Sequence, residues 1–122
     1  MARNDLLGKS RLLTDEYAVK ILMATVRSPR SAQQISEQYG IPIAACYRRI
    51  RDLEMAGLLH CTERRLSSQG KRVCFYQSRL RTASIQYENG RLRVRFTMQD
   101  GETDSEWQDV DLEGGGDEED RR

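Results

Sequence analysis

The sequence has little of what metal binding and catalysis require. Its 122 residues hold one histidine, His60, and three cysteines, Cys46, Cys61 and Cys74, with no CxxC pair. An odd number of widely spaced cysteines indicates neither a disulfide framework nor a zinc knuckle, so we expect reduced thiols. There is also no glycine-rich phosphate loop and no nucleophile motif from which an active site could be assembled. We therefore expect no enzyme, no cofactor and no metal ion.

Long apolar runs are absent as well. No stretch approaches the roughly 20 apolar residues that cross a bilayer, and the first five residues lack the apolar segment of a secretory signal. The length suits one domain with a single modest core. We expect a cytoplasmic protein with no membrane partner.

Negative charge is scarce in the body of the chain. Residues 1–99 hold 18 Lys and Arg against 8 Asp and Glu, whereas residues 100–122 hold 2 Arg against 11 acidic residues. A basic body suggests a polyanionic partner, because neutralised phosphates release counterions and so add affinity. The plainer interpretation is a solvated, arginine-rich surface.

The centre of the chain predicts a helix that packs on one face and is open on the other. Pro42 suits the first helical turn, since its fixed φ is already helical, and Gly57 ends the helix. Cys46, Ile50 and Leu53 recur at helical spacing and are predicted to pack. The opposite face would carry small residues, one phenol and two guanidinium groups, from Ala44, Ala45, Tyr47, Arg48 and Arg51. Such a face can enter a DNA major groove while its longer side chains reach base edges and phosphates.

Two further helices precede it. Residues 15–26 repeat apolar side chains at helical spacing, which predicts the first helix. Ser31 and Gln34 match a capping box, which predicts that a second helix runs over residues 32–39. Gly40 closes this helix just before the central one begins. Two helices joined by so short a turn are the helix-turn-helix arrangement.

Strand patterns follow the helices. Residues 58–65 and 72–77 favour strands around a turn-rich tip, which predicts a β-hairpin. Its basic residues are Arg64, Arg65, Lys71 and Arg72. We interpret this hairpin as a wing that contacts phosphates or a minor groove.

A second hairpin is predicted by Asn89-Gly90, because a type I′ turn needs positive φ at both central residues. Such a turn pairs Tyr87 with Leu92, Ile85 with Val94 and Ala83 with Phe96 on one apolar face, and turns Arg91, Arg93 and Arg95 to the other face. A lone two-stranded hairpin is marginal in water. We expect its apolar face to pack on the helical part, with a partner subunit as the alternative.

The C-terminal end is acidic. Residues 99–122 offer only Trp107, Val110 and Leu112 for burial, so they are predicted to be disordered. Such a tail would serve solubility. The alternative is that it folds over the basic face and competes with nucleic acid there.

Two segments resemble ArsR-type winged helix-turn-helix transcriptional regulators. They are SAQQISEQYGIPIAACYRRIRDLEMAGLL and GKRVCFYQSRLRTASIQYENGRLRV, the second being similar to short archaeal members of that group. The resemblance covers residues 14–97 and implies a DNA-binding regulator that acts as a homodimer on palindromic operators. It places the outward residues of the central helix against DNA, together with the wing from Arg64 to Arg72. The metal-sensing branch carries two neighbouring cysteines in this helix, whereas this chain has only Cys46, so no such metal site is expected and no effector is implied.

The other two cysteines leave an alternative open. Cys61 and Cys74 fall near one another across the wing and are interpreted as small, half-buried strand residues in a reducing cytoplasm. The alternative is a redox or soft-metal sensor that includes His60. Against it, His60 and Cys61 are successive strand residues and point to opposite faces.

Together these patterns predict an α+β protein. It would be a winged helix-turn-helix of three helices and a wing hairpin, with an additional C-terminal β-hairpin and a disordered acidic tail. The predicted parts are an arm or short helix (residues 1–13), the DNA-binding domain (14–81), the second hairpin (82–98) and the tail (99–122). The predicted function is sequence-specific binding of double-stranded DNA in transcription regulation. The alternative is a protein–protein interaction module in a larger assembly, since a fold alone does not decide function. RNA binding is less favoured, because no exposed aromatic platform is evident.

Overall fold

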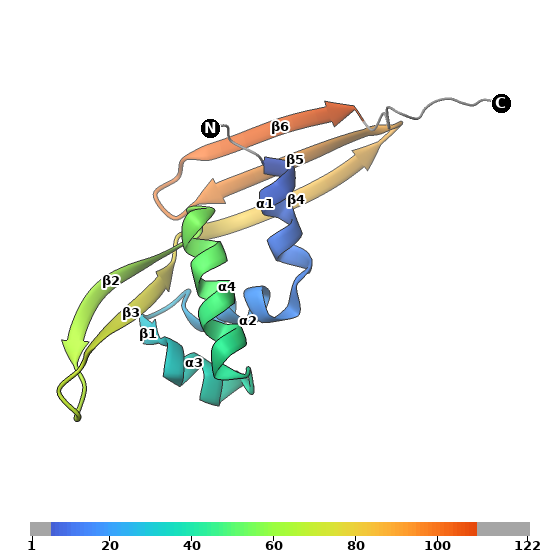
Figure 1. Cartoon of the computed structure of the whole chain (residues 1–122). Coiled ribbons are helices and arrows are strands. Elements are labelled where there is room, and N and C mark those ends of the chain that lie inside the picture. Colours follow the sequence, from blue (N-terminus) through green and yellow to red (C-terminus); the bar gives the residue numbers. More distant parts are fainter. Residues whose placement is uncertain (1–5, 110–122) are drawn as a thin grey trace.

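The computed structural model describes residues 6–109. In that part the chain forms helices and two antiparallel sheets of three strands each, which confirms the α+β class (Figure 1). The helical elements are α1 (Leu6–Ser10), the 3-10 turn η1 (Arg11–Thr14), α2 (Glu16–Ala24), α3 (Ala32–Tyr39) and α4 (Ile43–Met55). The strands are β1 (Arg30–Ser31), β2 (Leu59–Leu66), β3 (Arg72–Ser78), β4 (Leu80–Glu88), β5 (Arg91–Met98) and β6 (Thr103–Asp109). None of the helices in residues 6–109 has the length and apolar character needed to cross a membrane.

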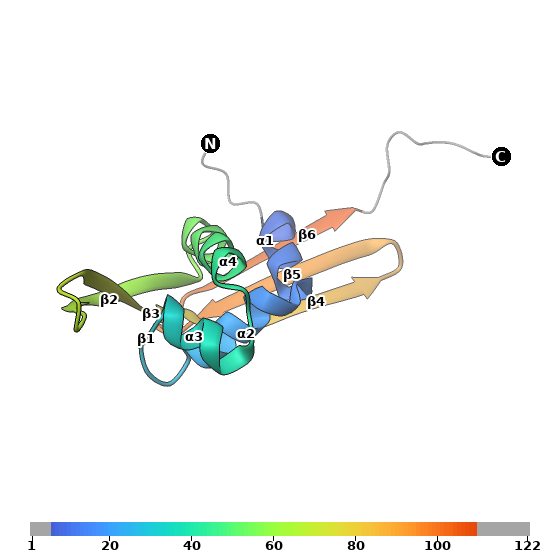
Figure 2. The same cartoon turned by 60° about the horizontal axis from the view of Figure 1, so that its bottom comes forward.

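The two sheets extend in different directions beside the helical part. Their strand orders are β1-β3-β2 and β4-β5-β6. The β2–β3 hairpin and the β4–β5 hairpin point away from each other in both views (Figures 1 and 2). The two sheets meet where β3 passes into β4 through the single residue Arg79, so the two hairpin turns extend in opposite directions from this junction.

Helix α3 begins and ends where the sequence predicts. The Ser31 hydroxyl accepts a hydrogen bond from the Gln34 backbone N–H at 3.1 Å, and the Gln34 side-chain oxygen accepts one from the Ser31 N–H at 3.0 Å. Gly40 ends the helix with a φ of +67°, a left-handed value that glycine tolerates best. Only Gly40, Ile41 and Pro42 separate α3 from α4, so the two helices are joined as closely as predicted.

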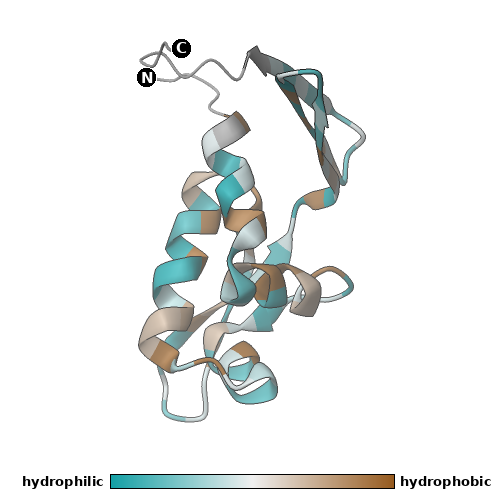
Figure 3. Ribbon diagram, turned by 90° about the vertical axis from the view of Figure 1, so that its right-hand side faces the viewer, coloured by the Kyte–Doolittle hydropathy of each residue, from teal (hydrophilic) through white to brown (hydrophobic). Residues whose placement is uncertain are grey.

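The core is built around one stripe of α4. Cys46, Ile50 and Leu53 are buried there, as their spacing predicts, and they pack with Ile21 of α2 and Ile35 of α3. Figure 3 shows hydrophobic and hydrophilic residues alternating along the helices, as a period of 3.6 residues requires. Each large aliphatic side chain buried in this way contributes about 1.5–3 kcal/mol. This stripe therefore fixes which face of α4 remains open.

The Asn89-Gly90 turn forms as predicted. The φ values are +49° at Asn89 and +83° at Gly90. The resulting register pairs Tyr87 with Leu92, Ile85 with Val94 and Ala83 with Phe96, the predicted set.

The apolar face of this second sheet packs at one end only. Val94 and Phe96 join the main core, and Leu6 of α1 is buried in the same cluster. The expected packing of the second hairpin on the helical part is therefore confirmed at this end. Residues 6–14, for which the sequence allowed either an arm or a short helix, are helical. Near the turn, Ile85 and Tyr87 remain 47% and 67% exposed.

Strand β6 corrects a prediction. The acidic composition predicts disorder from residue 99 onward, but residues 103–109 pair with β5 along its whole length. The edge of β5 offers unpaired backbone groups, and the Trp107 ring lies 4.7 Å from the Arg91 guanidinium and 5.3 Å from that of Arg93. The acidic composition of this segment does not predict a strand that forms by pairing with an existing sheet edge. Residues 110–122 lie outside the described part of the chain, as do residues 1–5. The predictions that residues 110–122 are disordered and compete with nucleic acid therefore remain predictions.

A single residue, Arg79, links the two sheets. Its N–H donates to the Leu58 carbonyl at 2.8 Å, and its carbonyl accepts from the Gln99 N–H at 2.7 Å. The neighbouring Ser78 N–H donates to the Thr25 carbonyl at the end of α2, at 3.1 Å. These backbone bonds hold the second sheet against the helical part.

An ion pair joins α4 to the start of α2. The sequence alone suggests the nearby acids Asp52 and Glu54 as partners of Arg49, but the structure pairs it with another element. The Arg49 Nε donates to the Asp15 carboxylate at 2.8 Å, because Arg49 lies on the flank of α4 that faces α2. Asp15 also caps α2 by accepting from the Ala18 N–H at 3.0 Å. Partial burial raises the pKa of Asp15, but the Ala18 N–H and the Arg49 guanidinium outweigh burial, so its pKa lies below the ordinary value of 3.8.

Replacing Asp15 should destabilise the fold. We expect Asp15→Ala to lower the free energy of unfolding by about 1–2 kcal/mol, because it removes the N-cap and a partner of Arg49. Glu16→Gln is the matched control, since Glu16 is an exposed residue of the same turn that pairs only with Lys20. It should change stability by less than about 0.5 kcal/mol. Urea unfolding measures both, and equal effects would contradict the role given to Asp15.

The same carboxylate should give a pH dependence. Its pKa is depressed by folding, so the stability it contributes is present above its unfolded pKa and is lost as the pH falls through the folded value. Asp15→Asn keeps a capping oxygen but cannot titrate. The stability difference between wild type and Asp15→Asn should therefore shrink as the pH is lowered below 3.8. A difference that stays constant in urea unfolding across this range would contradict the ion pair.

Candidate nucleic-acid interface

The open face of α4 carries most of the residues predicted for it. Ala44, Tyr47, Arg48 and Arg51 are exposed. Ala45, predicted to face outward as well, is only 8% exposed and belongs to the core. The reason is helical spacing, because Ala45 lies four residues before Arg49 and eight before Leu53, on the flank that packs against α2 and α3.

The hairpin predicted as a wing is basic and exposed. Arg64, Arg65, Lys71 and Arg72 all lie at the surface of β2, β3 and the turn between them. The turn is closed by the Ser67 N–H, which donates to the Lys71 carbonyl at 2.7 Å. The strands bend at a β-bulge between Cys61 and Glu63.

The basic side chains of this hairpin are divided between its two faces. Arg64 lies opposite Cys74 and on the same face as Arg72, whereas Arg65 lies opposite Val73 on the other face. Arg65 is held there by an ion pair with Glu63 and by the Phe75 ring, whose centroid lies 4.0 Å from its guanidinium. The sequence alone does not indicate this contact of Phe75, because it depends on the register of β2 against β3.

A groove runs between α4 and this hairpin. It has a volume of about 730 Å³ and is bounded by the N-terminal turn of α3, by Tyr47, and by β3 with its turn. The basic residues Arg65, Lys71 and Arg72 line it, and no acidic residue is among the described residues that do so. Tyr47 is thus brought next to three of the four predicted wing residues. Arg64 and the exposed arginines of α4 are not part of the groove wall.

Of the three residues of the alternative sensor site, Cys61 and Cys74 lie on one face of the hairpin, whereas His60 lines a separate pocket. Cys61 lies opposite Tyr76 and Cys74 opposite Arg64, so the two thiols are diagonal neighbours, and both are free. Burial and the neighbouring Cys74 thiol raise the pKa of Cys61, which disfavours its reactive thiolate. Residues 6–109 contain no cluster of three or more groups able to hold a metal ion.

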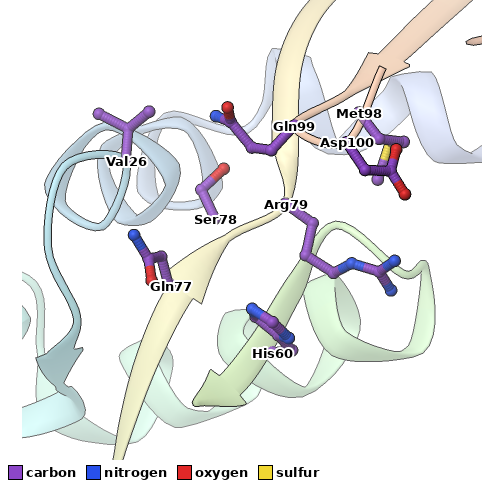
Figure 4. A pocket seen from close by; sticks show the side chains of 8 residues that line it. All are labelled: Val26, His60, Gln77, Ser78, Arg79, Met98, Gln99 and Asp100. Carbon is purple, nitrogen blue, oxygen red and sulfur yellow. The ribbon is translucent and has the colours of Figure 1, made fainter. Parts of the chain in front are cut away.

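His60 belongs to a different place in the fold. It lines a pocket of about 410 Å³ at the junction of the two sheets, with Gln77, Arg79 and Asp100 among its other polar residues (Figure 4). These side chains come from β2, β3, the Arg79 link and the turn after β5. No short sequence motif predicts this pocket, because its residues are brought together only by the packing of the two sheets.

The surface shared by α4 and the β2–β3 hairpin is therefore both basic and concave. No protein-family model and no curated protein sequence matches the chain. A helix with exposed guanidinium groups beside a groove lined by further cations suits a rigid polyanion that fills both.

The three thiols should differ in accessibility. Cys46 is fully buried and burial raises its pKa, whereas Cys61 and Cys74 are partly exposed. We expect a thiol reagent to modify Cys61 and Cys74 in the native protein, and Cys46 only after unfolding. Peptide mapping after timed labelling measures this. Modification of Cys46 at the rate of the other two would show that α4 does not pack as described.

Proposed function

We propose that the chain is a sequence-specific DNA-binding protein of the winged helix-turn-helix type, acting in transcription regulation, as its resemblance to ArsR-type regulators implies. The order of elements supports this. Helix α2, strand β1, helices α3 and α4 and the β2–β3 hairpin follow one another in the order of a winged helix, with β1 pairing beside β3. In this proposal α4 is the recognition helix and β2–β3 is the wing.

The observation that carries the proposal is the groove between α4 and the wing. A helix of about 10–12 Å diameter fits the major groove of B-DNA, which is about 12 Å wide. With α4 inserted there, the sugar-phosphate backbone at the edge of the major groove would lie against Tyr47, Lys71 and Arg72. Arg65, fixed over Phe75, would present its guanidinium to the same backbone with little loss of conformational freedom.

The outer residues of α4 would approach the bases. Ala44 is exposed and small, so it lets the helix backbone come close. Arg48 and Arg51 follow on the same side of the helix and are long enough to reach base edges or phosphates. Arginine readers of guanine give base preference, whereas phosphate contacts fix only position and orientation.

Two pairs of variants separate these roles. Arg48→Ala with Arg51→Ala should weaken binding by about 1–3 kcal/mol per base contact and relax base preference. Lys71→Ala with Arg72→Ala should weaken binding to all sequences alike and reduce the slope of log affinity against log salt by about 0.9 per lost phosphate contact. Arg95→Ala is the control, since Arg95 is an exposed arginine of the second sheet.

The measurement is fluorescence anisotropy of the full chain with a random pool of duplexes at two salt concentrations. Salt-sensitive binding that both double variants weaken and Arg95→Ala leaves unchanged is the expected result. Absence of binding at the lower salt concentration would contradict the proposal and favour a protein–protein interaction module. Binding that Arg95→Ala weakens as much as the others would move the interface to the second sheet.

A further inference from the structure

Strand β4 has an open edge. In the sheet order β4-β5-β6 it pairs with β5 on one side, and no element of residues 6–109 pairs with its other side. Its regular part, residues 82–88, contains no proline and no lysine, the residues that usually protect an exposed edge. A bulge interrupts the pairing only at the start, between Leu80 and Thr82. This edge is therefore able to accept another strand.

The turn determines which backbone groups face the open side. The residues that flank a two-residue hairpin turn, here Glu88 and Arg91, exchange backbone hydrogen bonds. Alternate residues back along β4 then bond to β5 in the same way. The residues between them, Ala83, Ile85 and Tyr87, present their N–H and carbonyl groups to the open edge.

The side chains beside this edge are apolar. Ile85 and Tyr87 are the exposed large hydrophobic residues of β4 noted above, and they lie on the face that carries Val94 and Phe96. On the same side of the molecule, a groove of about 420 Å³ runs between α2 and the start of β4. Its walls include Val19, Met23, Leu80 and Ala83. An exposed aromatic side chain and an apolar groove thus lie at the two ends of one strand.

The other edge of the sheet is different. Strand β6 carries Asp104 and Glu106, and the turn before it carries Asp100 and Glu102. Two copies of such a strand would repel each other. The ends of β4 carry opposite charges instead, Arg81 at the start and Glu88 at the end, so two antiparallel copies of β4 attract.

We propose that β4 pairs antiparallel with β4 of a second copy of this chain, about a two-fold axis at Ile85, to form one continuous six-stranded sheet. In this register Ile85 meets its own counterpart and Tyr87 lies opposite Ala83 of the other copy. The Tyr87 ring is then placed at the apolar groove between α2 and β4, on both sides of the axis. Glu88 comes opposite Thr82 of the other copy, next to its Arg81. The interface is isologous, so it closes as a dimer.

Cross-linking tests the register. Ser84 and Gln86 would face each other across the axis as a non-hydrogen-bonded pair, with Cα atoms about 4.5 Å apart, which suits a disulfide. In a background with Cys61→Ser and Cys74→Ser, the double variant Ser84→Cys/Gln86→Cys should form a covalent dimer on mild oxidation. Each single variant should not, because its cysteine faces an unmodified residue. No cross-link in the double variant, or an equal cross-link in Ser84→Cys alone, would overturn the proposed pairing.

Sedimentation of the full chain tests the dimer itself. We expect a species of twice the 14.1 kDa chain mass, and Tyr87→Ser should weaken its association about tenfold or more, since a buried tyrosine anchor is lost. Met55→Ser is the matched control, because Met55 is an exposed apolar side chain of α4, outside β4, and should leave association unchanged. Circular dichroism confirms that each variant is folded. A wild-type monomer at every concentration up to the solubility limit would overturn the proposal. Both tests are made without DNA, so their outcome is independent of the proposed function.

Discussion

The buried stripe of α4 is the constraint on which the rest of the structure depends. Cys46, Ile50 and Leu53 can leave water only by packing against α2 and α3, and that packing fixes the rotation of α4 about its own axis. The opposite face is then open, with its arginines and Tyr47 directed away from the core. The Arg49–Asp15 ion pair adds a second point of attachment between α4 and the start of α2. A face that is held rigidly in this way can recognise a rigid partner without losing much conformational freedom on binding.

The two sheets present different surfaces. The sheet of β1, β2 and β3 is anchored beside α3 and α4, and its free hairpin carries cations but few buried side chains. The second sheet is tied to the helical part through Arg79 and through Val94 and Phe96, and its apolar face extends beyond the core toward the turn. One hairpin is thus suited to a charged partner and the other to an apolar one. Their opposite directions allow both contacts at once (Figure 2).

Local patterns were sufficient for most of the elements. The capping box of Ser31 and Gln34, the left-handed Gly40 and the Asn89-Gly90 turn each act over four residues or fewer, so the sequence alone indicates them. The basic residues of the hairpin and the exposed arginines of α4 were predicted for the same reason, since strand and helix periods are local. The groove between Tyr47 of α4 and the hairpin was not predictable, because it depends on how far the hairpin bends toward Tyr47. The prediction that Ala45 faces outward was wrong for a similar reason. Ala45 lies at the border of the buried stripe, where the packing of α2 and α3 determines whether a residue is buried.

The sequence by itself determined the helices, the two hairpins and the register of the Asn89-Gly90 hairpin, because each is stabilised by hydrogen bonds between residues that are close along the chain or paired through one turn. Only the tertiary structure decided the partner of Arg49, which lies 34 residues away, and the conversion of acidic residues 103–109 into a strand on β5. It also decided the junction pocket around His60. These features join distant segments, and their free energy comes from burial and from an available sheet edge, neither of which exists until the rest of the chain has folded.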